Sequence, residues 1–312
     1  MPDAGSKPKR LLIALGGNAL IREGQEGSIE EQLANLSVPM RQIARLSREY
    51  RIIITHGNGP QVGNLLLQQE CSPEVPRLPL EILVAQTQGQ IGYLIESTLD
   101  TELAAAGLAD QLLVSLISYI VVDGDDPAFL RPTKPVGPAY RKEQAAGLPF
   151  PMVETAKGFR RVVASPEPVT VVEKREINKL LNEGFIVICC GGGGIPVIRE
   201  GRGFHGVDAV IDKDLASVRL AAEVGVDLFI IATDVPGVAI GFGTPQQRYI
   251  ESLTIDDAAR LQAEGHLPAG SMGPKVEAAV RFIRNGGQRA VICHLDDIEK
   301  AVAGKAGTRI TV

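Results

Sequence analysis

Short apolar runs recur along the chain, and each is followed by a glycine-containing turn and then by a helical pattern. Near-continuous apolar runs of this length are typical of parallel strands that are covered on both faces. We therefore expect a mainly parallel sheet whose strands alternate with helices. The four clearest runs are RLLIAL (10–15), RIIIT (51–55), FIVICC (185–190) and DLFIIAT (227–233).

The segments between these runs carry helical periodicity. Ser28 and Glu31 have the spacing of a capping box, and the helix that they begin places Leu33 and Leu36 on one face. A long, mostly apolar helix is predicted over 80–107, either buried or at an interface. The alternation as a whole predicts an α/β fold, a three-layer α/β/α sandwich with a mainly parallel open sheet. Ligands of such sheets bind at the carboxyl ends of the strands, where the glycine turns fall.

Residues 123–151 interrupt this alternation because they are rich in proline and glycine. A solvated linker is one interpretation of the segment. However, the alternating LLVSLISYIVV before it and RRVVASP after it are typical of strands that re-enter the fold. We therefore predict a small protruding subdomain, or lid, over 123–165.

The composition argues against several classes of protein. The 312 residues are 45% apolar and 22% charged, which is ordinary for a globular protein. A net charge of −5 and the absence of tryptophan argue against a nucleic-acid or anionic-membrane partner. The four cysteines lack metal-ligand spacing, and we predict no metal site, signal peptide or membrane-spanning run. A cytoplasmic protein in a reducing compartment is expected.

Two glycine turns follow the first two apolar runs, GGN at 16–18 and GNG at 57–59. Backbone N–H groups that are exposed in such turns, next to a helix start, bind anions. Two such turns at consecutive strand ends favour this function over packing alone. We therefore predict an anion cradle in which the asparagine amides donate hydrogen bonds without adding charge. Its members are Gly16, Gly17, Asn18, Gly57 and Asn58.

Two other phosphate-binding motifs fit the sequence less well. GNGPQVG is one residue longer than a dinucleotide fingerprint, and no acidic residue stands at a second strand tip about 20 positions later. A Walker-type loop is also absent, because Gly304 and Lys305 are followed by Ala306 and lack the earlier glycine. A dinucleotide-dependent oxidoreductase is therefore not expected.

Three lysines stand at positions that stability does not explain. Lys213 begins a helix between two aspartates, although the positive end of a helix dipole disfavours a lysine. Lys275 begins another helix beside a glycine turn, and Lys134 is held between prolines in the predicted lid. Each lysine alone is most simply a surface residue. Together with the glycine turns, the three predict a site that neutralises an anion.

These segments resemble the carbamate kinases of the amino-acid kinase superfamily. The resemblance runs from IALGGNAL (13–20) to GTRI (307–310), and TQGQIGY, RRVVASPEP, GGGGIPV and TDV also carry it. It implies a homodimer that transfers a phosphoryl group reversibly between ATP and carbamate, with Mg²⁺, giving ADP and carbamoyl phosphate. The chain would then be a single domain, 1–312, with a carbamate-binding half over about 9–190 and a nucleotide-binding half over about 191–312.

The resemblance also implies roles for individual residues. The two glycine turns would hold the carbamate and the transferring phosphoryl group. Lys213 and Lys275 would contact the phosphates, and Asp214 would orient these two lysines. Lys134 would reach in from the lid. His56 could contact the substrate, but it is equally well explained as a turn residue that bonds its own backbone. No covalent nucleophile is expected, because this chemistry depends on positioning and charge neutralisation. The nucleotide site would be lined by Thr233, Asp234 and Met272.

Two departures from related sequences narrow this interpretation. Ala14 stands where many amino-acid kinases carry a lysine, so Lys213 would supply the missing charge, which favours carbamate over other acceptor acids. Ala239 and Gly241 replace an aromatic residue and an asparagine near the expected adenine site, which bears on nucleotide preference. Two alternatives stay open: another small-acid kinase of the superfamily, or a nucleotide-binding sensor without catalysis.

Overall fold

A computed structural model describes residues 8–71, 74–155, 158–267 and 272–312. Its central sheet has eight strands, in the order β15 (Ser252–Thr254), β17 (Thr308–Thr311), β16 (Arg289–His294), β12 (Leu228–Thr233), β1 (Lys9–Leu15), β2 (Tyr50–His56), β9 (Ile186–Ile188) and β3 (Leu113–Ser115). Every neighbouring pair is parallel except β16 and β17. The mainly parallel open sheet is therefore confirmed, and all four apolar runs contribute strands to it.

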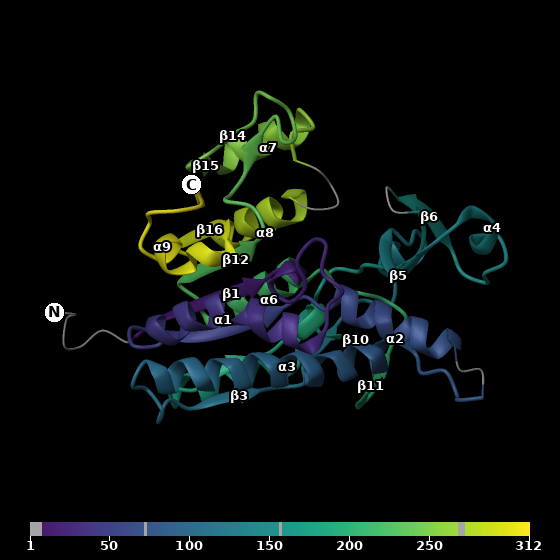
Figure 1. The fold of residues 1–312 in the computed structure, drawn as a ribbon, viewed down its shortest axis with the longest axis horizontal. Helices are drawn as coiled ribbons and strands as arrows, with labels where there is room; N and C mark the ends of the chain where they lie inside the picture. Colours follow the sequence, from purple (N-terminus) through teal and green to yellow (C-terminus); the bar gives the residue numbers. More distant parts are fainter. Residues whose placement is uncertain (1–7, 72–73, 156–157, 268–271) are drawn as a thin grey trace.

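Helices cover both faces of this sheet. One face is covered by α1 (Ile29–Leu46), α3 (Leu80–Ala105) and α9 (Ile298–Val302). The other face is covered by α5 (Lys174–Asn182), α6 (Lys213–Val224) and α8 (Met272–Arg284). Successive side chains of a strand point to opposite faces. Leu11 and Ile13 of β1 accordingly belong to the core under α1 and α3, whereas Leu12 and Ala14 belong to the core under α6 and α8. The predicted three-layer sandwich is confirmed (Figure 1).

Local sequence signals set the ends of several helices. The capping box at the start of α1 is complete, since the Glu31 N–H donates to Ser28 Oγ at 3.3 Å and the Ser28 N–H donates to the Glu31 carboxylate at 3.1 Å. Gly225 ends α6 with a left-handed φ of 67°, a conformation that favours glycine. The long apolar helix predicted over 80–107 is α3.

The proline-rich segment forms a separate small sheet with the order β5 (Lys134–Tyr140), β7 (Gly158–Val163) and β6 (Met152–Thr155), together with α4 (Lys142–Ala145). This unit, called the lid below, extends sideways from the body in Figure 1 and packs against α2 (Gly59–Cys71). A solvated linker is therefore wrong for this segment. The chain re-enters the body through a second sheet, β11 (Gly203–Gly206), β10 (Ile195–Glu200), β4 (Tyr119–Val121) and β8 (Thr170–Val171).

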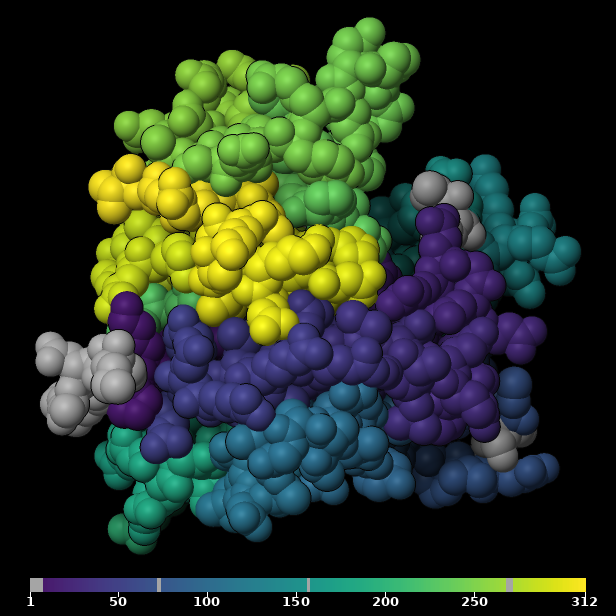
Figure 2. All heavy atoms as spheres, turned by 60° about the vertical axis from the view of Figure 1, so that its left-hand side comes forward, coloured from purple at the N-terminus to yellow at the C-terminus, as the bar shows by residue number. Residues whose placement is uncertain are grey.

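A second projection consists of the hairpin β13 (Ala239–Ile240) and β14 (Arg248–Tyr249) and the helix α7 (Ile255–Ala263). In Figure 2 this green projection and the teal lid rise from the body with open space between them. No helix within the described ranges is long and apolar enough to cross a membrane.

Candidate active site

The carboxyl ends of three strands lie side by side, because the sheet register pairs Leu15 of β1 with both His56 of β2 and Ala232 of β12. The turns that follow β1 and β2 are consequently in contact. The Gly57 N–H donates to the Leu15 carbonyl at 3.1 Å. A Cβ at Gly57 would stand 3.2 Å from the backbone nitrogen of Gly17, which is tighter than ordinary van der Waals contact. Residues 16–18 and 57–58 therefore form one surface, called the glycine cradle below.

A third glycine loop packs against this cradle. Gly191–Gly193 follow β9 and are buried. A Cβ at Gly191 would overlap the His56 imidazole, and one at Gly192 would overlap the Asn58 amide. Gly192 also has a φ of 66°, so only glycine fits here without displacing the cradle. The sequence analysis gave this loop no role, although a glycine run directly after a buried strand was an available signal.

Both asparagine amides of the cradle are held by other side chains. Asn58 Nδ2 donates to Thr87 Oγ1 at 2.9 Å, and Asn18 Nδ2 donates to Asp234 Oδ2 at 2.6 Å. A side-chain amide nitrogen has two protons, so one proton of each asparagine is committed to the protein. Each amide therefore has one N–H left that could donate to an anion.

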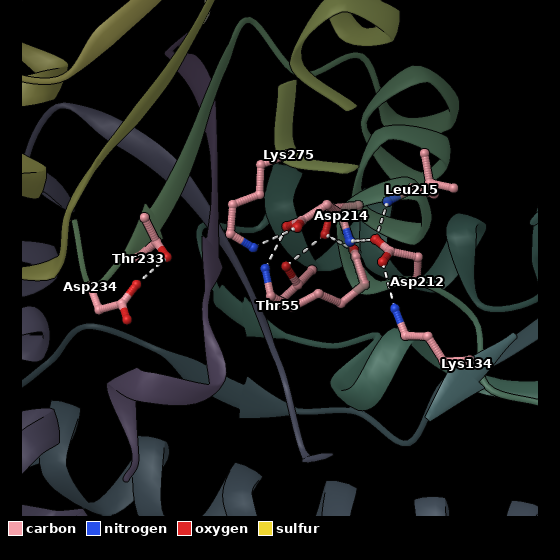
Figure 3. Close-up of polar contacts among 10 residues, drawn as sticks. Thr55, Lys134, Asp212, Asp214, Leu215, Thr233, Asp234 and Lys275 are labelled. Atoms are coloured by element: carbon pink, nitrogen blue, oxygen red, sulfur yellow. Dashed lines mark hydrogen bonds and ion pairs between the residues drawn. The ribbon is translucent and has the colours of Figure 1, made fainter. Parts of the chain in front are cut away.

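Lys213, at the start of α6, and Lys275, in the first turn of α8, both pair with Asp214. Figure 3 shows Lys275 pointing toward Asp214. Lys213 pairs with one carboxylate oxygen of Asp214, and Lys275 Nζ lies 3.2 Å from the other. The Asp214 side chain is only 3% exposed, and those of the two lysines are 12% and 16% exposed. This group of three residues, called the lysine cluster below, therefore carries two positive charges and one negative charge in a mostly buried position.

The charges of the cluster support one another. Burial alone would raise the pKa of Asp214, but attraction by Lys213 and Lys275 outweighs it and lowers this pKa to about 2. Burial lowers the pKa of Lys213, and the Asp214 carboxylate opposes that shift. The carboxylate is therefore ionised at neutral pH, and it favours the charged form of the lysine beside it. The excess positive charge is suited to a phosphate group.

Lys134 reaches from the first residue of β5 to Asp212, and Lys134 Nζ lies 2.8 Å from Asp212 Oδ2 (Figure 3). The other oxygen of Asp212 caps α6, because it accepts the N–H of Asp214 at 2.9 Å and that of Leu215 at 3.4 Å. The sequence analysis gave Asp212 no role, although aspartate is a favoured N-cap residue. Asp212 thus connects the lid to the helix that carries Lys213.

A second anchor fixes the first turn of α6 against the sheet. Ser217 Oγ donates to the Lys213 carbonyl at 2.6 Å, so the Thr55 hydroxyl is the donor in its 2.8 Å bond to Ser217 Oγ. Thr55 lies in β2, one residue before His56. The sequence contains no pattern from which this pair could be found, because the two hydroxyls meet only when α6 packs on the sheet.

A pocket of about 220 Å³ adjoins the lysine cluster, since Lys275 belongs to both. Thr233 and Asp234, at the end of β12, line it, and Asp234 also holds Asn18 of the cradle. The glycine turn expected before Lys275 falls partly in 268–271, outside the described residues. The structure brings together every residue that the sequence analysis assigned to a site. The pocket is lined by Thr233, Asp234, Val235, Gly237, Ala239, Phe242, His266, Met272 and Lys275.

No sequence signal pointed to His266, which also lines this pocket. The small side chain of Ala239 lines the pocket where relatives were expected to place an aromatic residue. Gly241 has a left-handed φ of 62°, and Phe242 follows it and lines the same pocket. An aromatic side chain is therefore present at this pocket at position 242, whereas position 239 offers only a methyl group.

The model of the amino acid kinase family matches residues 9–294. The chain belongs to the amino acid kinase family. It is 47% identical to the carbamate kinase of Pyrococcus furiosus, over 97% of this chain and 99% of that protein, and 45% identical to that of Haemophilus influenzae, over 97% and 96%. The resemblance inferred from the motifs is confirmed, and the protein is a phosphotransferase.

Solved structures of this family share the fold over nearly the whole chain. An Aeropyrum pernix K1 protein is 42% identical and has a TM-score of 0.91, covering 97% of this chain and 100% of its own. A carbamate kinase from Giardia lamblia bound to AMP-PNP is 38% identical and has a TM-score of 0.89, covering 97% and 98%. These matches confirm the fold class that the apolar pattern predicted.

His56 gives this member of the amino acid kinase family a defined acid sensitivity. Burial lowers the pKa of His56 to about 4, and the positive charge of Lys213 lowers it as well. The hydrogen bond from His56 Nδ1–H to the Gly57 carbonyl acts in the opposite direction. The unfolded state binds a proton as the pH falls through about 6.5, but the folded state does not until about 4. As the pH falls from about 6.5 to about 4, protonation of His56 in the unfolded state therefore lowers the free energy of unfolding. The total decrease is about 3 kcal/mol.

The test compares denaturant unfolding of the wild type and His56→Gln at several pH values. Below about pH 6.5 the wild type should lose more stability than the variant, which has no imidazole to protonate. His205→Gln is the matched control, because the His205 side chain is 67% exposed. Parallel pH curves for the wild type and His56→Gln would contradict the prediction.

Proposed function

We propose that this protein catalyses reversible phosphoryl transfer between ATP and carbamate, giving ADP and carbamoyl phosphate. The observation that carries the proposal is the position of the lysine cluster. Lys213 Cδ is 3.7 Å from the point where a Cβ would stand at Gly57 of the cradle, and Lys275 lines the pocket. The cluster thus adjoins both an anion cradle and a pocket at the edge of the sheet, in a chain whose relatives are named carbamate kinase.

The mechanism needs no covalent intermediate. A carboxylate oxygen of carbamate attacks the γ-phosphorus of ATP, and the bond from that phosphorus to the oxygen of the leaving ADP breaks. This oxygen is already an anion, so no general base is required. Charge on the transferring group is neutralised by Lys213 and Lys275 and by backbone N–H groups of the cradle. Asp214 holds the two ammonium groups at one point without cancelling both charges.

The nucleotide would occupy the pocket at the end of β12. Thr233, Asp234 and Met272 would line its site, and Phe242 would offer an aromatic face to the base. The carbamate kinase of Giardia lamblia has been solved with AMP-PNP bound, which supports this part of the proposal. In this arrangement residues of about 191–312 hold the nucleotide and those of about 9–190 hold the carbamate. Lys134 would complete the charge set from the lid, proposed as 123–165.

Magnesium would enter the reaction as part of the substrate, bound to the nucleotide. Within the described ranges, no group of three or more His, Cys, Asp or Glu side chains is placed to hold a metal ion. Asp212 and Asp214, the carboxylates nearest the lysines, are already paired with them. Magnesium commonly keeps water and phosphate ligands and few protein carboxylates. These residues therefore fit an ion carried by ATP or ADP better than a resident metal.

The experiment that tests the function is a coupled assay of ATP formation from ADP, Mg²⁺ and carbamoyl phosphate. We expect ATP to form at a rate proportional to enzyme concentration. No ATP from carbamoyl phosphate, but turnover with an amino-acid acyl phosphate, would identify another small-acid kinase instead. Binding of ADP without turnover of either compound would identify a nucleotide sensor.

The proposal includes a homodimer that uses the outer face of α3. Tyr93 is 69% exposed and Ile82 is 42% exposed on this helix, and a Cβ at Gly89 between them would meet no atom within 4 Å. Exposed apolar residues grouped in this way mark interaction surfaces.

Light scattering after size exclusion should give twice the mass of the chain, and Tyr93→Glu should shift the measured mass toward that of the monomer. A wild-type monomer would contradict the dimer.

A further inference from the structure

Two buried polar side chains of α3 stand directly behind the glycine cradle. Thr87 is fully buried and Gln88 is 3% exposed, although they lie in a helix whose other buried residues are mostly apolar. Buried hydroxyl and amide groups are costly unless they are hydrogen-bonded. Each side chain makes one hydrogen bond to a loop of the site, Thr87 to Asn58 and Gln88 to Gly191.

Thr87 sets the orientation of the Asn58 amide. Thr87 Oγ1 donates its single proton to the Val84 carbonyl at 2.8 Å, and it can therefore only accept from Asn58. The atom of Asn58 that faces it must be the nitrogen, and Nδ2 lies 2.9 Å away. Gly192 packs against the same amide so closely that a Cβ there would overlap it. The Asn58 side chain is thus fixed by Thr87 on one side and by Gly192 on the other. These two contacts also set the direction of its second N–H and of its Oδ1.

Gln88 fixes the loop that packs against Asn58. Its Nε2 donates to the Gly191 carbonyl at 3.0 Å and to the Ser118 carbonyl at 3.2 Å, while its Oε1 accepts the Ser118 N–H at 2.8 Å. Ser118 Oγ in turn accepts the N–H of Cys190 at 3.1 Å. Both amide protons of Gln88 are used, so the side chain cannot rotate without losing these bonds. Gln88 thus holds Gly191 in its close packing against the His56 ring, next to the cradle.

We propose that Thr87 and Gln88 are positioning residues for the anion that binds the glycine cradle. They act through Asn58 and Gly191, and neither lines the nucleotide pocket or belongs to the lysine cluster. The inference rests on the proposed function for the identity of the anion, carbamate or carbamoyl phosphate. It assigns α3 a part in substrate binding that is separate from the surface on its outer face.

The test uses the isosteric change Thr87→Val, which replaces the accepting hydroxyl by a methyl group and removes the hydrogen bond that orients the Asn58 amide. We expect kcat/KM for carbamoyl phosphate to fall by about 10- to 100-fold, because displaced binding groups lower rates by such factors. The dissociation constant for ADP should stay within about twofold, since the nucleotide pocket is untouched. Thr87→Ser keeps the hydroxyl and should restore activity.

Matched controls separate positioning from loss of structure. Thr101→Val removes an exposed hydroxyl of the same helix, one that donates to the Ser97 carbonyl, and should leave both constants unchanged. Gln88→Met removes the other contact at similar volume, and it provides an independent test if Thr87→Val does not fold. Unchanged kinetics in a folded Thr87→Val or Gln88→Met, or ADP affinity that falls in step with kcat/KM, would overturn the inference.

A binding measurement distinguishes this inference from the proposed function. A wild type that does not convert carbamoyl phosphate would contradict the function alone. The affinity of the cradle for inorganic phosphate, measured by calorimetry without nucleotide, still tests the positioning in that case. It should fall in Thr87→Val and Gln88→Met but not in Thr101→Val, and equal affinities in all four proteins would overturn the inference.

Discussion

Replacing Lys213 or Lys275 with alanine is expected to lower kcat for phosphoryl transfer by about 10²- to 10³-fold in each case. Each ammonium group lies in a mostly buried position, where a charge stabilises the transition state more than it does in water. Either change leaves Asp214 with one lysine partner, so the buried carboxylate is not stranded and the fold should survive. Steady-state rates of ATP formation, together with thermal melting by circular dichroism, measure both effects.

Two further variants sharpen this prediction. Lys142→Ala removes an exposed lysine of α4 in the lid that does not belong to the cluster, and it should keep normal turnover. Lys213→Arg keeps the charge but changes the shape of the donor group, so it should recover part of the activity. Near-normal turnover in both Lys213→Ala and Lys275→Ala would show that the cluster does not carry the reaction.

Asp214→Asn is expected to reduce both stability and activity. The substitution keeps the shape of the side chain but removes the carboxylate that both buried ammonium groups share. Breaking a buried ion pair costs about 3–5 kcal/mol. Lys213 would relieve this cost by losing a proton, so its pKa, which burial already lowers, should fall further. The basic limb of the kcat–pH profile should therefore move to lower pH, and the midpoint of chemical denaturation should decrease.

The matched control for this variant is Asp208→Asn. Asp208 also pairs with a cation, since its carboxylate lies 2.6 Å from Arg161, but its side chain is 60% exposed. Exposed ion pairs contribute about 0–1 kcal/mol, so Asp208→Asn should change stability little and leave the pH profile where it is. An Asp214→Asn protein with wild-type stability and an unshifted basic limb would refute the role given to this carboxylate.

The elements that the sequence predicted well are those whose signals are local. RIIIT carries three consecutive isoleucines because both faces of β2 are covered. The capping box of Ser28 and Glu31 involves bonds within one helical turn. The lid was predicted from composition, but its strand order was not. The antiparallel order β5-β7-β6 depends on pairing between segments that the composition does not distinguish.

The residues of the site also divide into those with a local sequence signal and those without one. Lys213 and Lys275 were found because a lysine at a helix start opposes the helix dipole, an anomaly visible in a single turn of sequence. Asp212 and Thr55 were missed because each acts through a contact with another element. Asp212 looks like an ordinary helix cap until the lid brings Lys134 to its second oxygen.

The sequence by itself determined the alternation of strand and helix, the glycine turns at the strand ends and the identity of the charged residues. These are local properties, because apolar runs, helix caps and glycine turns can each be recognised from a few neighbouring residues. Only the tertiary structure decided that Asp214 receives two lysines, that Asn58 is fixed between Thr87 and Gly192, and that Asn18 is held by Asp234. Such contacts join residues far apart in the chain, and they exist only once the parallel register has aligned the strand ends.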